Sequence, residues 1–252
     1  MSLPKPYYQD DWATIYHGDC REILPLLPKV DLVLTDPPYG HNNNNGDMIS
    51  RRETIFGGEK VERERRPISN DGEEANELVR WFFCEAKKLL VVGGCCCCCC
   101  GGGGPDPQFA RWSLWMEEAI GFKHAVVWDK GPMGMGHHYR RSYEFILVGQ
   151  NGNPCKWYAE TKDIENIIRP GDLEVNKIIP SAEQHPTEKP IGLMKWFIPL
   201  HSRIGETILD PFMGSGTTLR AAKDLKRKSI GIEIEEKYCE IAVKRLRQEV
   251  LI

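Results

Sequence analysis

Short apolar runs, bounded by glycine, proline or aspartate, recur along the whole chain and predict the strands of one sheet. Most of them lack the strict alternation of apolar and polar positions that a half-exposed strand shows. Continuous apolar character is typical of strands that are covered on both faces. The predicted strands are residues 13–17, 31–35, 95–100, 125–128, 144–148, 207–209 and 229–233.

Stretches with apolar residues at helical spacing lie between most of these runs. They predict helices at residues 73–90, 106–120, 191–201, 217–225 and 236–250. Strands that alternate with helices predict an α/β fold with a doubly wound, mostly parallel sheet. No helix-length pattern separates residues 125–128 from 144–148, so we expect these two strands to form an antiparallel pair at one edge.

Six of the ten cysteines are consecutive, at residues 95–100. Neighbouring side chains on a strand point to opposite faces, so these thiols cannot converge on one metal ion or pair with each other. No second half of a zinc motif follows. We therefore predict no metal site, and a buried strand in which cysteine acts as a small apolar residue. The flanking glycines, Gly93-Gly94 and residues 101–104, are predicted to form turns at its two ends.

Two segments have no strand or helix pattern. Residues 40–72 contain four consecutive asparagines and a mixed-charge run, and they predict a mobile loop. Residues 151–184 form a second irregular insert. No linker composition divides the chain, so we expect one domain over residues 1–252.

The net charge of −3 gives no global basic field, which argues against a nucleic-acid packaging protein. It permits an enzyme that holds DNA in a local basic cleft. The amino-terminal residues lack the apolar run of a signal peptide, and no stretch is long enough to span a bilayer. We expect a cytoplasmic protein with no membrane partner.

A glycine-rich turn joins the predicted strand 207–209 to a helix. It reads Asp210-Pro211-Phe212-Met213-Gly214-Ser215-Gly216-Thr217. Glycines let the backbone approach a ligand closely, and the helix N-terminus favours negative charge. A phosphate-binding P-loop needs lysine where Thr217 stands, and a dinucleotide fingerprint needs glycine where Leu219 stands.

The next predicted strand ends at Glu233, a position suited to bind ribose hydroxyls. A nucleoside ligand without phosphates fits this pattern, and S-adenosylmethionine meets the requirement. At the tip of the strand 13–17, Asp19 could accept a hydrogen bond from the adenine amine of that cofactor.

The turn Asp36-Pro37-Pro38-Tyr39 follows the predicted strand 31–35. An exocyclic amine of a base is a poor nucleophile, because its lone pair is delocalised into the ring. Asp36 supplies a charged acceptor for one N–H group, and the carbonyl of Pro37 supplies a second, on a backbone that proline fixes. Tyr39 offers an aromatic face for a base that is taken out of the duplex. The alternative interpretation of this motif is a β-turn that is capped by Asp36 and has no catalytic role.

With these motifs in this order, the chain resembles the β class of amino-DNA methyltransferases, the circularly permuted group in which the catalytic turn precedes the cofactor turn. Segments 17–20, 31–40, 185–190, 210–218 and 231–234 resemble its motifs over nearly the whole chain, and residues 128–144 resemble its late catalytic motif. The resemblance implies catalytic roles for Asp36, Pro37, Pro38 and Tyr39. It implies cofactor contacts at Asp19, Cys20, Asp36, Thr187, Lys189, Pro190, Asp210, Pro211, Phe212, Gly214, Ser215, Gly216, Thr217 and Glu233.

The resemblance implies the S-adenosylmethionine-dependent methyltransferase fold, a circularly permuted, seven-stranded sheet with one antiparallel strand. It also implies methylation of the N6 amine of adenine in double-stranded DNA, with N4 of cytosine as the alternative, in the manner of restriction–modification enzymes. The target-recognition region would be residues 151–184, which is short. A short recognition sequence or a homodimer would account for that length.

Other readings remain at this point. An enzyme that methylates RNA or a protein amide usually has asparagine in place of Asp36 and carries the cofactor turn first. A non-catalytic DNA-binding module would not need Asp36, Tyr39, Gly214 and Glu233 together. Saturable binding of a nicotinamide cofactor would favour a third interpretation, a Rossmann dehydrogenase.

The candidate DNA contacts are His137, His138, Tyr139, Arg140 and Arg141. If Arg140 and Arg141 contact phosphates, replacing both with alanine should lower the slope of log affinity for DNA against log salt by about two, because each contact releases roughly one counterion. The measurement is a salt titration of DNA binding. An unchanged slope would place both arginines away from the duplex.

Overall fold

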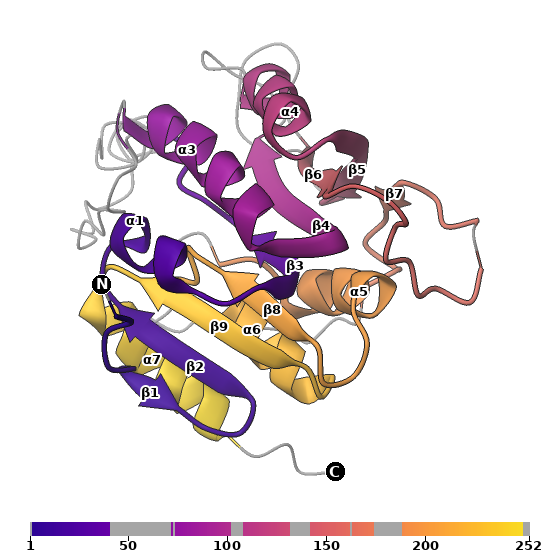
Figure 1. The fold of residues 1–252 in the computed structure, drawn as a ribbon. Helices are drawn as coiled ribbons and strands as arrows, with labels where there is room; N and C mark the ends of the chain where they lie inside the picture. Colours follow the sequence, from indigo (N-terminus) through magenta and orange to yellow (C-terminus); the bar gives the residue numbers. More distant parts are fainter. Residues whose placement is uncertain are drawn as a thin grey trace, which may run out of the picture.

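The computed structural model describes residues 2–40, 72, 74–101, 108–131, 142–161, 163–173 and 188–248. Its centre is one twisted sheet with helices on both faces (Figure 1). The predicted loop 40–72 lies almost wholly outside the described residues. Part of the insert 151–184, Thr187 and the candidate DNA contacts His137 to Arg141 also lie outside them.

All seven predicted strands are present, most of them longer than the apolar runs. Two further strands of two residues each, β1 and β7, are too short to leave a sequence pattern. The sheet order is β1-β2-β9-β8-β3-β4-β6-β5-β7. The bounds are β1 Tyr8–Gln9, β2 Ala13–His17, β3 Val30–Thr35, β4 Leu90–Gly101, β5 Phe122–Asp129, β6 Tyr143–Gln150, β7 Ile167–Ile168, β8 Thr207–Asp210 and β9 Lys228–Glu233.

The strands β2, β9, β8, β3 and β4 run parallel to one another. Strand β6 is antiparallel to both of its neighbours, β4 and β5, and is the single antiparallel member of the predicted seven. The predicted antiparallel pair is therefore confirmed, although β7 lies beyond it at the edge, parallel to β5. The parallel strands end at one common edge of the sheet, which we call the carboxyl edge.

Helices cover both faces in two layers (Figure 1). One layer contains α1 (Cys20–Ile23), η1 (Leu24–Leu26), α3 (Glu74–Leu89) and α4 (Gln108–Ala119). The other contains α5 (Ile191–His201), α6 (Thr217–Asp224) and α7 (Glu236–Arg247). The five long helices match the predicted ones to within a few residues, and α5 matches its prediction at both ends. The short α1 and η1 were not predicted.

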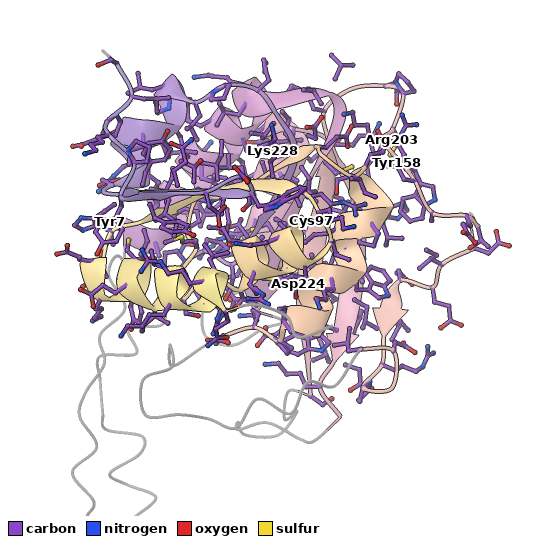
Figure 2. All side chains as sticks on the ribbon, turned by 90° about the horizontal axis from the view of Figure 1, so that it is seen from below. Tyr7, Cys97, Tyr158, Arg203, Asp224 and Lys228 are labelled. Carbon is purple, nitrogen blue, oxygen red and sulfur yellow. The ribbon has the colours of Figure 1, made fainter. Side chains whose placement is uncertain are left out.

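The cysteine run lies in the middle of β4, between β3 and β6. Cys95, Cys97 and Cys99 belong to the apolar cluster under α5, and the three alternate cysteines belong to the cluster under α3 and α4. All six are at most 1% exposed; Cys97 is labelled in Figure 2. The prediction of small apolar residues on opposite faces of a buried strand is confirmed.

The predicted glycine turn before this strand is wrong, because β4 begins at Leu90 and contains Gly93 and Gly94. Gly93 adopts a φ of +82°, and a Cβ atom there would lie 2.0 Å from the carbonyl oxygen of Pro154. The glycine therefore serves the close approach of another segment rather than a turn. At the other end of the strand, Gly101 is its last residue, and the rest of the predicted turn, residues 102–104, lies outside the described residues.

That neighbouring segment is the start of the insert, which is fastened to the edge of the sheet opposite the carboxyl edge. The ammonium of Lys156 lies 2.6 Å from Asp31 Oδ1 and 3.0 Å from Glu206 Oε1. The guanidinium of Arg203 lies 4.5 Å from the ring centroid of Tyr158 (Figure 2). The insert then returns through β7, which runs parallel to β5 and so points toward the carboxyl edge.

Candidate active site

The two motifs that dominate the sequence meet at the carboxyl edge. Strands β3 and β8 are parallel neighbours, with Leu32 opposite Ile208 and Val33 opposite Leu209. One step further along, the hydroxyl of Thr35 donates a buried hydrogen bond of 2.6 Å to Asp210 Oδ1. Asp36, the next residue, therefore lies beside the glycine-rich turn, although 175 residues separate Thr35 from Asp210.

Asp210 is 3% exposed and acts as an internal anchor. Burial raises the pKa of its carboxyl to about 6, while hydrogen bonds from Thr35, Thr218 and the amide of Phe212 act in the opposite direction. The amide of Phe212 lies 3.2 Å from Asp210 Oδ1. The carboxylate thus holds the first residues of the turn in place rather than facing solvent.

The turn itself depends on two glycines with left-handed backbone, Gly214 with a φ of +50° and Gly216 with a φ of +80°. Gly216 caps α6, and a Cβ atom there would lie 2.7 Å from the Cβ of Ala242. This helix start packs directly on α7, so glycine is required sterically as well as conformationally. Pro211 is buried, and the ring of Phe212 packs edge-on against Phe82 at 5.4 Å between centroids.

Glu233 closes the other side of the turn at the end of β9. Its Oε2 accepts from the amide of Gly214 at 3.0 Å, and its Oε1 accepts from the amide of Glu235 at 2.8 Å. Burial raises the pKa of Glu233 to about 7, and the two amide hydrogen bonds oppose that rise. A carboxylate has further lone pairs, so Glu233 can still accept from ligand hydroxyls.

Asp19 and Cys20 follow β2, whose last residue, His17, is opposite Glu233. Asp19 caps α1 and binds Arg21, whose Nε donates to both of its carboxylate oxygens, which lowers the pKa of Asp19. Cys20 is 6% exposed, and burial raises the pKa of its thiol to about 12. Its side chain belongs to the core, so only its backbone is left to face a ligand.

The turn at Asp36 is closed by hydrogen bonds to its carboxylate. The hydroxyl of Tyr39 donates to Asp36 Oδ1 at 2.9 Å, and the ammonium of Lys189 donates to Oδ2 at 2.6 Å. Desolvation and the charge of Asp36 hold the pKa of Tyr39 well above its ordinary value, so the phenol stays a donor. Of the two prolines between Asp36 and Tyr39, Pro37 is buried and Pro38 is partly buried.

Lys189 lies in the centre of this cluster, just before α5, and is 8% exposed. Its Nζ is 3.6 Å from Glu144 Oε2 and 5.1 Å from the centroid of the Tyr39 ring. Burial alone would lower the pKa of Lys189, but the carboxylates of Asp36 and Glu144 outweigh it and raise the pKa above its ordinary value. The structure therefore directs this lysine to the carboxylate of Asp36. Pro190 is the N-cap of α5.

Sequence reasoning missed a second charged pair, Glu188 and Arg245. The Nη2 atom of Arg245 lies 2.8 Å from each carboxylate oxygen of Glu188. The same pair also binds two hydroxyl groups of the glycine-rich turn. Ser215 donates to Glu188 at 2.7 Å, and Arg245 donates to the hydroxyl of Thr217 at 2.8 Å. Glu188 stands in a motif that was recognised, but nothing in the local sequence of α7 marks Arg245.

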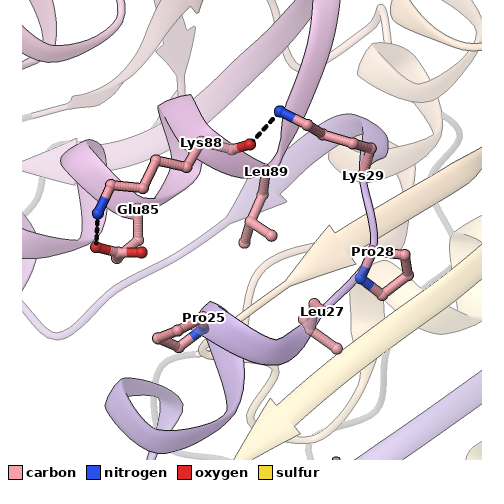
Figure 3. Close-up of a pocket in the computed structure, with 7 residues that line it drawn as sticks. All are labelled: Pro25, Leu27, Pro28, Lys29, Glu85, Lys88 and Leu89. Atoms are coloured by element: carbon pink, nitrogen blue, oxygen red, sulfur yellow. Dashed lines mark hydrogen bonds and ion pairs between the residues drawn. The ribbon is translucent and has the colours of Figure 1, made fainter.

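The pocket drawn in Figure 3 is unrelated to this site. Its lining residues Leu27 and Lys29 precede β3, and Leu89 precedes β4, so it lies at the opposite edge of the sheet. Among the described residues, no group of three or more histidine, cysteine or acidic side chains could hold a metal ion. No helix in the described part of the chain is long and apolar enough to cross a membrane.

The chemistry of the carboxyl edge fits a nucleoside cofactor. Glu233 offers a carboxylate beside an amide-lined turn, Asp19 offers another across β9, and no lysine follows the glycines to bind a phosphate. The expected cofactor, S-adenosylmethionine, has ribose hydroxyls and an adenine amine to match these acceptors, and it has no phosphate.

Comparison with known proteins agrees with this geometry. A family model described as DNA methylase matches residues 30–244. The chain is 46% identical over 229 residues to the type II methyltransferase M.HpaI of Haemophilus parainfluenzae. The aligned region covers 87% of this chain and 69% of that protein. It is 27% identical to the DNA adenine methyltransferase YhdJ of Escherichia coli K12, over 95% of this chain and 84% of that protein. The crystal structure of the M1.HpyAVI–SAM complex matches with a TM-score of 0.63 and 26% identity, covering 93% of this chain and all 100% of that one.

The pKa of Glu233 predicts how cofactor affinity depends on pH. Because the ionised form is the better acceptor, affinity should fall as pH drops through about 7. Between pH 8 and pH 6 we expect a loss of up to about tenfold, since one pKa unit corresponds to a factor of ten. Calorimetric titration of S-adenosylmethionine measures this. Glu233→Gln should bind more weakly with a flatter profile; an equal pH dependence in both proteins would remove Glu233 from the binding site.

Proposed function

The chain belongs to the DNA methylase family, with S-adenosylmethionine as its cofactor, and we propose that it methylates the N6 amine of adenine in double-stranded DNA. The observation that carries the proposal is the position of Asp36, an anionic acceptor beside the glycine-rich turn. The bound cofactor supplies an electrophilic methyl group. The protein supplies the acceptors that orient the target amine.

Asp36 is held so that it can act on that amine. Tyr39 and Lys189 each donate a hydrogen bond to the carboxylate and so fix its orientation. Each carboxylate oxygen has two lone pairs, which leaves capacity for an N–H group of the base. A second N–H group would donate to the carbonyl of Pro37. With both protons directed into acceptors, the nitrogen lone pair points toward the methyl donor.

The cofactor is proposed to lie across the tips of β2, β9 and β8. Glu233 would accept from the ribose hydroxyls, and Asp19 would accept from the adenine amine. The amides of the turn at Gly214 would approach the rest of the molecule. Ser215 and Thr217 already bind the Glu188–Arg245 pair, so they would act by shaping the turn.

The choice of adenine rests on the acidic first residue of the turn and on the similarity to YhdJ, which is itself named an adenine methyltransferase. Several relatives are named type II methyltransferases, which supports a role in site-specific modification. Within the insert, residues 151–158 lie at the far edge of the sheet. We therefore assign target recognition to the part of 151–184 that follows β7. A homodimer would extend this small surface.

The assignment of the base can be tested directly. Plasmid DNA from a strain without methyltransferases is incubated with the protein and isotopically labelled S-adenosylmethionine, and then digested to nucleosides for mass spectrometry. We expect label in N6-methyl-2′-deoxyadenosine. Label in N4-methyl-2′-deoxycytidine would replace adenine with cytosine as the target. Unlabelled DNA, in a preparation that binds the cofactor, would contradict the proposed function.

A substitution at Asp36 separates the two halves of the site. Asp36→Ala should lower the rate of transfer by at least about a hundredfold, the usual effect of removing one preorganised polar group. Cofactor affinity should stay nearly unchanged, because Asp36 acts on the base. Single-turnover kinetics and calorimetry measure the two quantities. Lost cofactor binding with retained transfer would reverse the assignment.

A further inference from the structure

Four charged side chains of alternating sign form a row at the catalytic turn: Asp36, Lys189, Glu144 and Lys130. Lys189 is 2.6 Å from Asp36 on one side and 3.6 Å from Glu144 on the other. Lys130 pairs with the second oxygen of Glu144. The side chain of Lys189 is 8% exposed, so it needs a carboxylate partner at all times.

One carboxylate oxygen of Glu144 accepts no hydrogen bond from the part of the chain that the structure describes. Its Oε2 is buried and, among the described residues, lacks a hydrogen-bond partner. The ammonium of Lys189 is the cation that faces it, at an ion-pair distance that is too long for a hydrogen bond. Buried acceptors without partners are rare in folded proteins and unfavourable. Glu144 Oε2 is therefore an acceptor within reach of Lys189 to which the lysine does not donate in its present position.

We propose that Lys189 is a positioning residue that moves from Asp36 to Glu144 when the target base enters the site. This inference rests on the proposed function, in which the amine of the base binds Asp36. While the base is absent, Lys189 holds the carboxylate oriented through Oδ2. When an N–H group of the base takes that oxygen, Lys189 donates to Glu144 Oε2 instead.

The exchange is small and keeps every charge paired. A shift of the ammonium by about 1 Å would make the Glu144 contact a hydrogen bond. Lys130 holds the other oxygen of Glu144 throughout, and the ring of Tyr39 lies 5.1 Å from the ammonium. One buried hydrogen bond replaces another, so the free energy needed to release Asp36 is low.

The test is Glu144→Gln, which keeps the shape of the side chain and removes the charge that receives Lys189. With Lys189 confined to Asp36, the base should compete poorly for that carboxylate. We expect single-turnover methylation to slow by about ten- to hundredfold, with cofactor affinity unchanged. Independently of activity, 2-aminopurine placed next to the target adenine, which keeps its own N6 amine, should gain at least roughly threefold less fluorescence on binding than with the wild-type protein.

The chain offers a matched control at the opposite edge of the sheet. Lys156 also lies between two carboxylates, Asp31 and Glu206. Glu206→Gln makes the same chemical change at a structural lysine and should leave both the methylation rate and the 2-aminopurine signal unchanged. Any general effect of weakening a carboxylate–lysine pair would appear in this variant as well.

The outcomes separate the inference from the proposed function. Wild-type rate and fluorescence in Glu144→Gln would overturn the movement of Lys189 while leaving methylation intact. Reduced cofactor affinity in that variant would also overturn it, by assigning Glu144 to the folding of the site. A wild-type protein that binds S-adenosylmethionine and methylates no DNA would contradict the proposed function itself.

Discussion

The hydrogen bond between Thr35 and Asp210 joins the two halves of the site. It is buried, and it links the last residue of β3 to the last residue of β8, so neither strand tip can shift without the other. Asp36 and the glycine-rich turn take their relative positions from it. Parallel pairing of the two strands sets the register, and burial of Asp210 makes the bond hard to exchange for water. The carboxylate of Asp36 and the glycine-rich turn, which are remote in sequence, are thus held as neighbours.

The charged side chains around this hydrogen bond form ion pairs. Lys189 compensates Asp36, and Arg245 compensates Glu188 on the other side of the turn. Such pairs gain little stability over apolar packing, but losing one partner leaves a buried charge that is strongly unfavourable. Their value lies in orientation, since Lys189 donates one hydrogen bond to Asp36 and Arg245 donates two to Glu188. Arg245 of this pair also links α7 to Thr217, the first residue of α6. This contact holds the glycine-rich turn on the side of α7.

The sequence predicts most of the sheet, because apolar runs of four or more residues must be buried whatever their partners. Helix α5 was predicted at both ends, since Pro190 starts it and Ser202 follows its apolar stretch. Short elements escaped: α1 depends on a cap by Asp19, and β7 is only two residues long. Glu188 and Arg245 are 57 residues apart, and a contact at that separation leaves no local pattern. The glycine at 93 was assigned to a turn because nothing in its neighbours reveals the segment that crosses it.

The fastening of Lys156 to Asp31 and Glu206 has an evolutionary consequence. It fixes one end of the insert to the scaffold at the edge farthest from the chemistry, and β7 fixes a second point. Under the proposed function, the residues that recognise the target lie beyond that second point, and the segment is held at its other end by Glu188 and Lys189, which contact Ser215 and Asp36. A change of DNA specificity would then be confined to a segment that is fastened at both ends, while the strands that carry Asp36 and Glu233 stay unchanged.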